Sequence, residues 1–156
     1  MTTTWIIAAD SSRARILQVM DREEHLSEID DLLNPAARAD ERDLISDAHA
    51  RFRGTSGPAS DREETSAAEH ATDLFAKRLG DYLESARNAH RYDRLHLVAP
   101  PKFLGQLRKA LGKEVQKLVS DELPKDLSWL NVRDFERQYF RGRGATGTEE
   151  PPARRR

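Results

Sequence analysis

The chain has 156 residues, of which 37% are hydrophobic and 34% charged, and it contains no cysteine. This length fits one domain, and the lack of cysteine excludes disulfides, thiolate metal sites and cysteine nucleophiles. The net charge of −1 hides an asymmetry, because residues 1–75 hold 8 basic and 16 acidic residues and residues 76–156 hold 18 basic and 11 acidic residues. An asymmetry of this kind indicates either an interaction surface or two halves that interleave in the fold so that their charges largely cancel, and the second interpretation is favoured.

Hydropathy argues against a membrane or secretory segment. No stretch approaches the roughly 18 consecutive apolar residues that a membrane span needs. The first residues also lack the basic and apolar regions of a signal peptide. We therefore expect a cytoplasmic protein without a membrane span.

The first part of the chain predicts three strands. Residues 3–9 form a short apolar, β-branched run, residues 14–20 alternate between apolar and polar, and residues 25–33 do so more weakly. Asp10, Ser11 and Ser12 favour a turn because their side chains bond their own backbone. The short links favour an antiparallel meander.

A long connection follows, over residues 34–60. It contains a candidate helix at 36–45 and the run Gly54-Thr55-Ser56-Gly57-Pro58, which does not fit regular structure. A connection of this length in a small domain is either functional or disordered.

The remaining chain alternates helices and strands. Ser60 and Glu63 have the spacing of a capping box, and apolar residues then recur at helical spacing over 61–89. Residues 95–99 predict a strand that ends at two prolines, and residues 103–119 predict a second amphipathic helix.

Weaker patterns predict a last strand at 127–130 and a last helix at 132–140. From Arg141 onward the composition is that of a disordered tail, residues 141–156. We therefore expect one domain over residues 3–140. Its predicted fold is α/β and ribonuclease H-like, with a mixed sheet in which three antiparallel strands precede alternating helices and parallel strands.

Several stretches together resemble the host attachment protein family, described as proteins required for attachment to host cells. The most specific of them are Ala9–Arg15 (ADSSRAR) and Val98–Arg108 (VAPPKFLGQLR), and others are Leu33–Arg38, Asp43–Asp47 and Lys125–Leu127. The resemblance implies kinship with release-factor middle domains and with translation-machinery components of that fold. The corresponding loop, residues 51–58, lacks the Gly-Gly-Gln of release factors, so peptidyl-tRNA hydrolysis is not expected.

Polar residues flanking the long connection form the first candidate binding group: Asn34, Arg38, Asp47, Arg51 and Arg53. The arginines suit a phosphate or carboxylate ligand. Alternatively, Asn34 caps a turn and Arg38 pairs with Asp47 to staple the loop, and this structural role is favoured.

Acidic residues form a second candidate site. A ribonuclease H-type nuclease clusters carboxylates around two metal ions, and Asp10, Glu69 and Asp73 could supply some of them. The fourth strand, however, ends in Val98-Ala99-Pro100-Pro101 where a further acid is needed. Asp10 is then more simply a turn residue. No histidine has a metal-ligand spacing such as HExxH, and no metal or cofactor is expected.

A third group lies on the second predicted helix, where Lys102, Lys109, Lys113 and Lys117 fall near one face. This face is either merely solvated or a contact for RNA phosphates. We therefore predict a non-enzymatic host attachment family protein that acts through RNA, ribosome or protein contacts. The alternatives are a metal-dependent hydrolase of RNA or of a phosphorylated ligand, and a pure protein-interaction module. The sequence predicts no catalytic residue and no oligomeric state.

Overall fold

A computed structural model describes residues 2–20, 25–36 and 58–145 of the chain, and the side chains within these ranges except at 58–66 and 142–145. The described residues form one mixed sheet with strand order β3-β2-β1-β4-β5. Strands β1 (Thr3–Ala9), β2 (Arg13–Met20) and β3 (Ser27–Leu33) are antiparallel neighbours. Strand β4 (Arg94–Val98) pairs in parallel with β1, and β5 (Val119–Leu123) pairs in parallel with β4. The predicted α/β class with a mixed sheet is confirmed.

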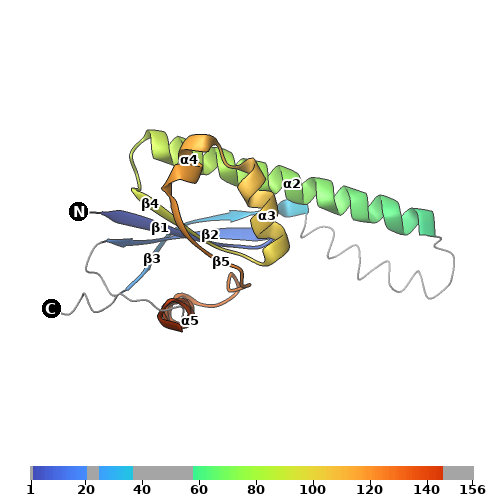
Figure 1. Cartoon of the computed structure of the whole chain (residues 1–156). Coiled ribbons are helices and arrows are strands. Elements are labelled where there is room, and N and C mark those ends of the chain that lie inside the picture. Colours follow the sequence, from blue (N-terminus) through green and yellow to red (C-terminus); the bar gives the residue numbers. More distant parts are fainter. Residues whose placement is uncertain (1, 21–24, 37–57, 146–156) are drawn as a thin grey trace.

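Two layers of helices enclose this sheet (Figure 1). Helices α2 (Pro58–Asn88), α3 (Pro101–Ala110) and α4 (Lys113–Leu118) cover one face. Helix α5 (Val132–Ala145) covers the other. None of the described helices is both long and apolar enough to cross a bilayer.

Strand β1 is central, and its side chains alternate between the two cores. Trp5, Ile7 and Ala9 pack toward α2 and α3, whereas Ile6 and Ala8 pack toward α5. All five are fully buried. Burial on both faces explains why this strand is a continuous apolar run rather than an alternating one.

Helices α2 and α3 approach each other closely at Gly80. A Cβ atom at this position would lie 2.7 Å from the carbonyl oxygen of Ala110. A glycine is therefore required there, because a side chain would collide with backbone that cannot swing away. This contact fixes the position of α3 relative to α2.

The predicted helix over 103–119 is wrong in its second half. Leu111 is extended, so α3 ends at Ala110; α4 begins at Lys113, and Val119 already belongs to β5. The side-chain amide of Gln116 donates to the carbonyl oxygens of Leu111 (2.8 Å) and Arg108 (3.3 Å). Because these bonds satisfy carbonyl groups at the end of α3, the break between α3 and α4 costs little free energy.

The predicted strand at 127–130 is also wrong, because β5 occupies Val119–Leu123. Residues 127–130 instead form a turn in which the backbone N–H of Leu130 donates to the carbonyl oxygen of Leu127 at 3.2 Å. Other boundaries differ less. Helix α2 begins three residues before the predicted 61, and α5 continues to Ala145, past the predicted start of the tail. The candidate helix at 36–45 lies almost entirely outside the described residues.

Candidate functional site

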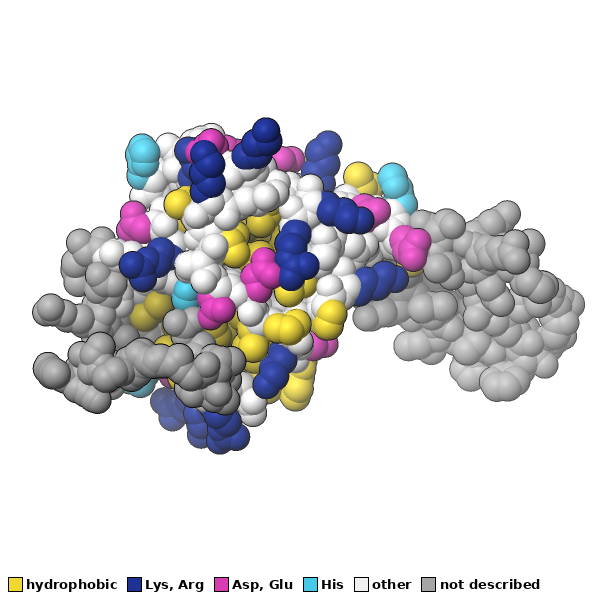
Figure 2. Space-filling view, viewed as in Figure 1, with side chains coloured by type: hydrophobic (Ala, Val, Ile, Leu, Met, Phe, Trp, Pro, Cys, Tyr) yellow, Lys and Arg dark blue, Asp and Glu magenta, His cyan; other side chains and the backbone are white. Residues whose placement is uncertain are grey.

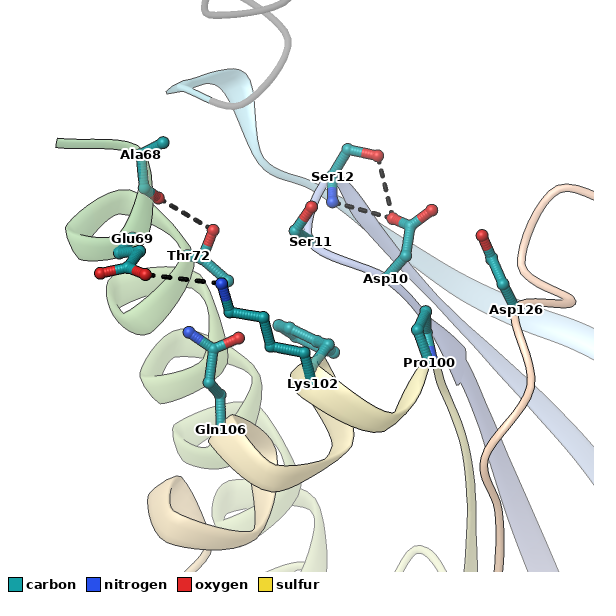
Figure 3. Close-up of a pocket in the computed structure, with 11 residues that line it drawn as sticks. Asp10, Ser11, Ser12, Ala68, Glu69, Thr72, Pro100, Lys102, Gln106 and Asp126 are labelled. Carbon is teal, nitrogen blue, oxygen red and sulfur yellow. Dashed lines mark hydrogen bonds and ion pairs between the residues drawn. The ribbon is translucent and has the colours of Figure 1, made fainter. Parts of the chain in front are cut away.

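The carboxyl ends of the three mutually parallel strands meet at one edge of the sheet. Asp10 follows β1, Pro100 lies two residues after β4, and Asp126 lies three residues after β5. All three line one pocket of about 470 Å³, which α2 and α3 close from the side (Figure 3). We call it the edge pocket, and its lining residues are Asp10, Ser11, Ser12, Ala68, Glu69, Thr72, Pro100, Lys102, Phe103, Gln106 and Asp126. Open α/β sheets bind their ligands just beyond the carboxyl ends of the strands, and this pocket lies in that position.

Asp10 holds the β1–β2 turn that forms one wall. Its Oδ1 accepts hydrogen bonds from the backbone N–H of Ser12 (2.8 Å), the hydroxyl of Ser12 (2.9 Å) and the backbone N–H of Arg13 (3.0 Å). Its Oδ2 accepts a bond from the hydroxyl of Ser128 at 3.0 Å. The carboxylate therefore bonds its own turn, as its sequence context indicated, and also ties that turn to residue 128.

Asp126 lies beside Asp10, on the same side of the pocket (Figure 3). The Ser128 hydroxyl lies 3.2 Å from Asp126 Oδ1. Asp126 Oδ2 has no hydrogen bond within the described residues. One carboxylate oxygen with free acceptor capacity therefore lies on this wall of the pocket.

The opposite wall is polar and belongs to α2 and α3. Lys102 Nζ lies 3.4 Å from Glu69 Oε2, and Gln106 donates to Asp73 at 2.9 Å (Figure 3 shows the Lys102–Glu69 pair). Both partners of the Lys102–Glu69 pair are exposed, so water screens it and it breaks easily. No side chain caps α3, which leaves the first backbone N–H groups of this helix without an intrahelical partner beside Lys102.

The three predicted acidic residues lie near one another but do not converge. Asp10 and Glu69 line opposite walls of the edge pocket, and Asp73 bonds Gln106 beside it. Within the described ranges, no three His, Asp or Glu side chains are close enough together to hold a metal ion by themselves.

Asn34 does not line the edge pocket. It is buried, its side-chain amide donates to the carbonyl oxygen of Ser11, and its backbone N–H donates to that of Ser12, both at 2.9 Å. It thus supports the β1–β2 turn from behind, in agreement with its predicted structural role. Arg38, Asp47, Arg51 and Arg53 lie outside the described residues.

The four lysines of the second predicted helix belong to two separate helices. Lys102 lines the edge pocket, and the other three, Lys109, Lys113 and Lys117, are here called the lysine face. Lys102 and Lys109 are on α3, whereas Lys113 and Lys117 are on α4, so the continuous spacing predicted between them is interrupted. Lys117 pairs with Glu114 at 3.2 Å. Figure 2 shows acidic side chains interspersed with the basic ones on the side of the molecule that presents α3 and α4.

Buried charge supports the turn that carries Ser128. The Arg15 guanidinium is buried, forms a two-pronged ion pair with Glu28 (2.9 and 3.1 Å), and donates to the carbonyl oxygens of Ser128 (3.1 Å) and Leu130. Neither this role of Arg15 nor the place of Asp126 in the pocket was predicted from the sequence. The available signal was the family resemblance, which included both Arg15 and Asp126.

Comparison with known proteins identifies the family of this chain. Residues 5–138 match a family described as "Protein required for attachment to host cells". The chain belongs to this family. A curated but uncharacterized protein of Rickettsia prowazekii (strain Madrid E) is 40% identical over 53 residues, which are 34% of this chain and 35% of that protein.

Among solved structures, a Ppx/GppA phosphatase of Aquifex aeolicus superposes with a TM-score of 0.40 and 11% sequence identity. The match covers 79% of this chain and 35% of the phosphatase. The chain therefore spans about a third of the length of each of these two proteins.

Proposed function

We propose that this host attachment family member is a binding protein whose edge pocket takes a phosphate-bearing small molecule as its complex with a divalent cation. The observation that carries the proposal is the mixture of groups in the pocket. Carboxylates from Asp10, Glu69 and Asp126 lie together with hydroxyls, the ammonium group of Lys102 and uncapped amides of α3.

The charge balance favours a cation complex over a bare anion. Three carboxylates and one ammonium group line the pocket, so an uncomplexed phosphate would be repelled. Mg²⁺ typically binds through one or two carboxylates, several waters and the phosphates of its ligand rather than in a cage made of protein groups. Asp126, with its free oxygen, suits the cation, and Lys102 with the α3 amides suits the phosphates.

Binding without turnover is the simpler proposal, because Asp10 is engaged by four hydrogen bonds within the fold. A metal-dependent hydrolase needs a carboxylate free to hold metal or activate water. This role for Asp10 would require it to give up bonds that hold the β1–β2 turn.

Calorimetry with inorganic pyrophosphate tests the proposal. We expect binding with Mg²⁺ present and none with excess chelator. Lys102→Gln and Asp126→Asn should each weaken binding at least about tenfold, the loss of one charge-assisted bond. Lys109→Gln, on the same helix but outside the pocket, is the matched control and should bind as the wild type does. Equal binding with and without Mg²⁺, or no binding at all, would refute the proposal.

RNA or ribosome binding through the lysine face is the second candidate. Lys109 and Lys113 are exposed and have no ion-pair partner within the described residues, so they are available to phosphates. Co-sedimentation with ribosomes at low salt, lost when Lys109, Lys113 and Lys117 are changed to Gln, would support it. No co-sedimentation at low salt would reject it.

The strand order also supports our proposal that the fold is ribonuclease H-like, with three antiparallel strands before the two parallel ones. We further propose kinship with release-factor middle domains and a cytoplasmic location. Attachment would then be an indirect consequence of ligand or partner binding.

A further inference from the structure

We propose that Trp129 is a stacking platform at the rim of the edge pocket and that the phosphate-bearing ligand is a nucleotide whose base stacks on this indole. This inference rests on the proposed function, because it places the base relative to phosphates bound in the pocket. Three features of the turn at 127–130 carry it.

The first feature is exposure. Trp129 is 69% exposed, the highest value among the large hydrophobic side chains that are exposed in the described part of the chain. The residues before it point inward, since Leu127 is 8% exposed and Ser128 is fully buried. The turn therefore directs its largest apolar side chain to solvent while burying its smaller neighbours.

The second feature is that the indole is held in place. Trp129 Nε1 donates to the carbonyl oxygen of Asp126 at 3.0 Å. The backbone of this turn is itself held by the buried Arg15, which donates to the carbonyl oxygens of Ser128 and Leu130. A pre-positioned aromatic surface loses little conformational entropy when a ligand covers it.

The third feature is proximity to the edge pocket. Asp126 both lines the pocket and accepts the hydrogen bond from the indole. Ser128, the residue before Trp129, donates to Asp10, which lines the same wall as Asp126, at 3.0 Å. The platform and the proposed phosphate site thus share Asp126, and a nucleotide joins a planar base to phosphates in one molecule.

Alanine substitution typically shows that stacking of a base on an aromatic side chain changes affinity by about tenfold or more. We therefore expect Mg²⁺–ADP to bind about tenfold more tightly than Mg²⁺–pyrophosphate. Trp129→Ala should abolish this difference and leave pyrophosphate binding unchanged, whereas Trp129→Phe should retain most of it. Indole fluorescence gives a second readout on the wild-type protein, since ADP should quench Trp129 and pyrophosphate should not.

Calorimetry of both ligands against the three proteins separates the two proposals. If the wild type binds neither ligand, the proposed function and the platform both fail. If pyrophosphate binds and ADP binds no more tightly, the platform alone is refuted. Equal losses for both ligands in Trp129→Ala would also refute it, because they would show a general effect on the pocket. Tighter binding of a single-stranded RNA oligonucleotide than of ADP would overturn the nucleotide as the ligand.

Discussion

The edge pocket and the lysine face both gather polar side chains, yet the fold holds them differently. In the pocket, the β1–β2 turn and the turn at 127–130 are joined by the Ser128–Asp10 bond and supported by the buried Arg15. The lysine face consists of exposed side chains on two short helices, one of them in an exposed ion pair. Groups fixed by buried bonds are pre-organised for one ligand geometry, whereas solvated lysines offer charge without geometry.

Breaking the support of the pocket has the largest expected effect. Arg15→Met leaves Glu28 unpaired and two carbonyl oxygens unsatisfied, so we expect a loss of about 3 kcal/mol in the free energy of unfolding. Urea unfolding followed by circular dichroism measures it. The matched control is Arg108→Met, which removes the exposed Arg108–Glu122 pair beside the lysine face and should leave the urea midpoint nearly unchanged. Equal losses in the two variants would contradict the difference drawn between the regions.

Two glycines test how α3, which contributes to both regions, is positioned. Gly80→Ala places a Cβ against the Ala110 carbonyl, and we expect a loss of about 2 kcal/mol. Gly105→Ala has open space around the new Cβ and should stabilise the helix by about 0.5–1 kcal/mol. Thermal unfolding of both variants checks the pair. Stabilisation by both substitutions would show that α2 and α3 do not pack closely at Gly80.

A hydrogen bond remote from both regions shows how much an exposed contact contributes to the free energy of unfolding. The Tyr82 hydroxyl donates to Asp30 at 2.6 Å and holds the pKa of that carboxyl below its usual value of 3.8. Burial, followed by the bond to Asp30, raises the pKa of Tyr82 to about 12. Tyr82→Phe should cost about 0.5–1 kcal/mol at pH 7.

The pH dependence of that cost follows from the lowered pKa of Asp30. Its contribution is present above the unfolded-state pKa and is lost as pH falls through the folded-state pKa. Urea unfolding of wild type and Tyr82→Phe between pH 6 and pH 2 should show the two stabilities converging at the acid end. A difference independent of pH would reject the bond to the ionised carboxylate.

The smallest effect is expected at the lysine face. Changing both Lys109 and Lys113 to Gln should alter Mg²⁺–pyrophosphate affinity less than twofold, because exposed charges outside the pocket act weakly through water. Calorimetry at 0.15 M salt measures this. A tenfold loss would show that the lysine face, and not the edge pocket, holds the phosphates.

Local patterns were sufficient to predict much of the fold. The apolar run of β1 and the turn chemistry of Asp10 act over a few residues, and both predictions hold. The break at Leu111 was not predictable from periodicity, because Val115 and Val119 continue the apolar spacing of α3 while belonging to α4 and β5. Gln116, which satisfies the end of α3, has no distinctive pattern in the sequence.

The site was predicted only in part, for a similar reason. Asp10 and Glu69 were named, but Asp126 reaches the pocket through parallel pairing of β5 with β4, a contact that local sequence does not encode. Because the last strand was predicted at 127–130, the position of Asp126 after the last strand was not recognised. With β5 placed at 127–130, the turn that carries Ser128 and Trp129 would have been part of the sheet.

Chemical-shift mapping of the ¹⁵N-labelled protein with Mg²⁺–pyrophosphate is the most direct test of the edge pocket. We predict that the amides of Asp10–Ser12, Lys102, Phe103 and Asp126 shift on titration, and that those of Lys109, Lys113 and Lys117 do not. Shifts confined to the lysine face, or no saturable shifts with Mg²⁺ present, would contradict the account.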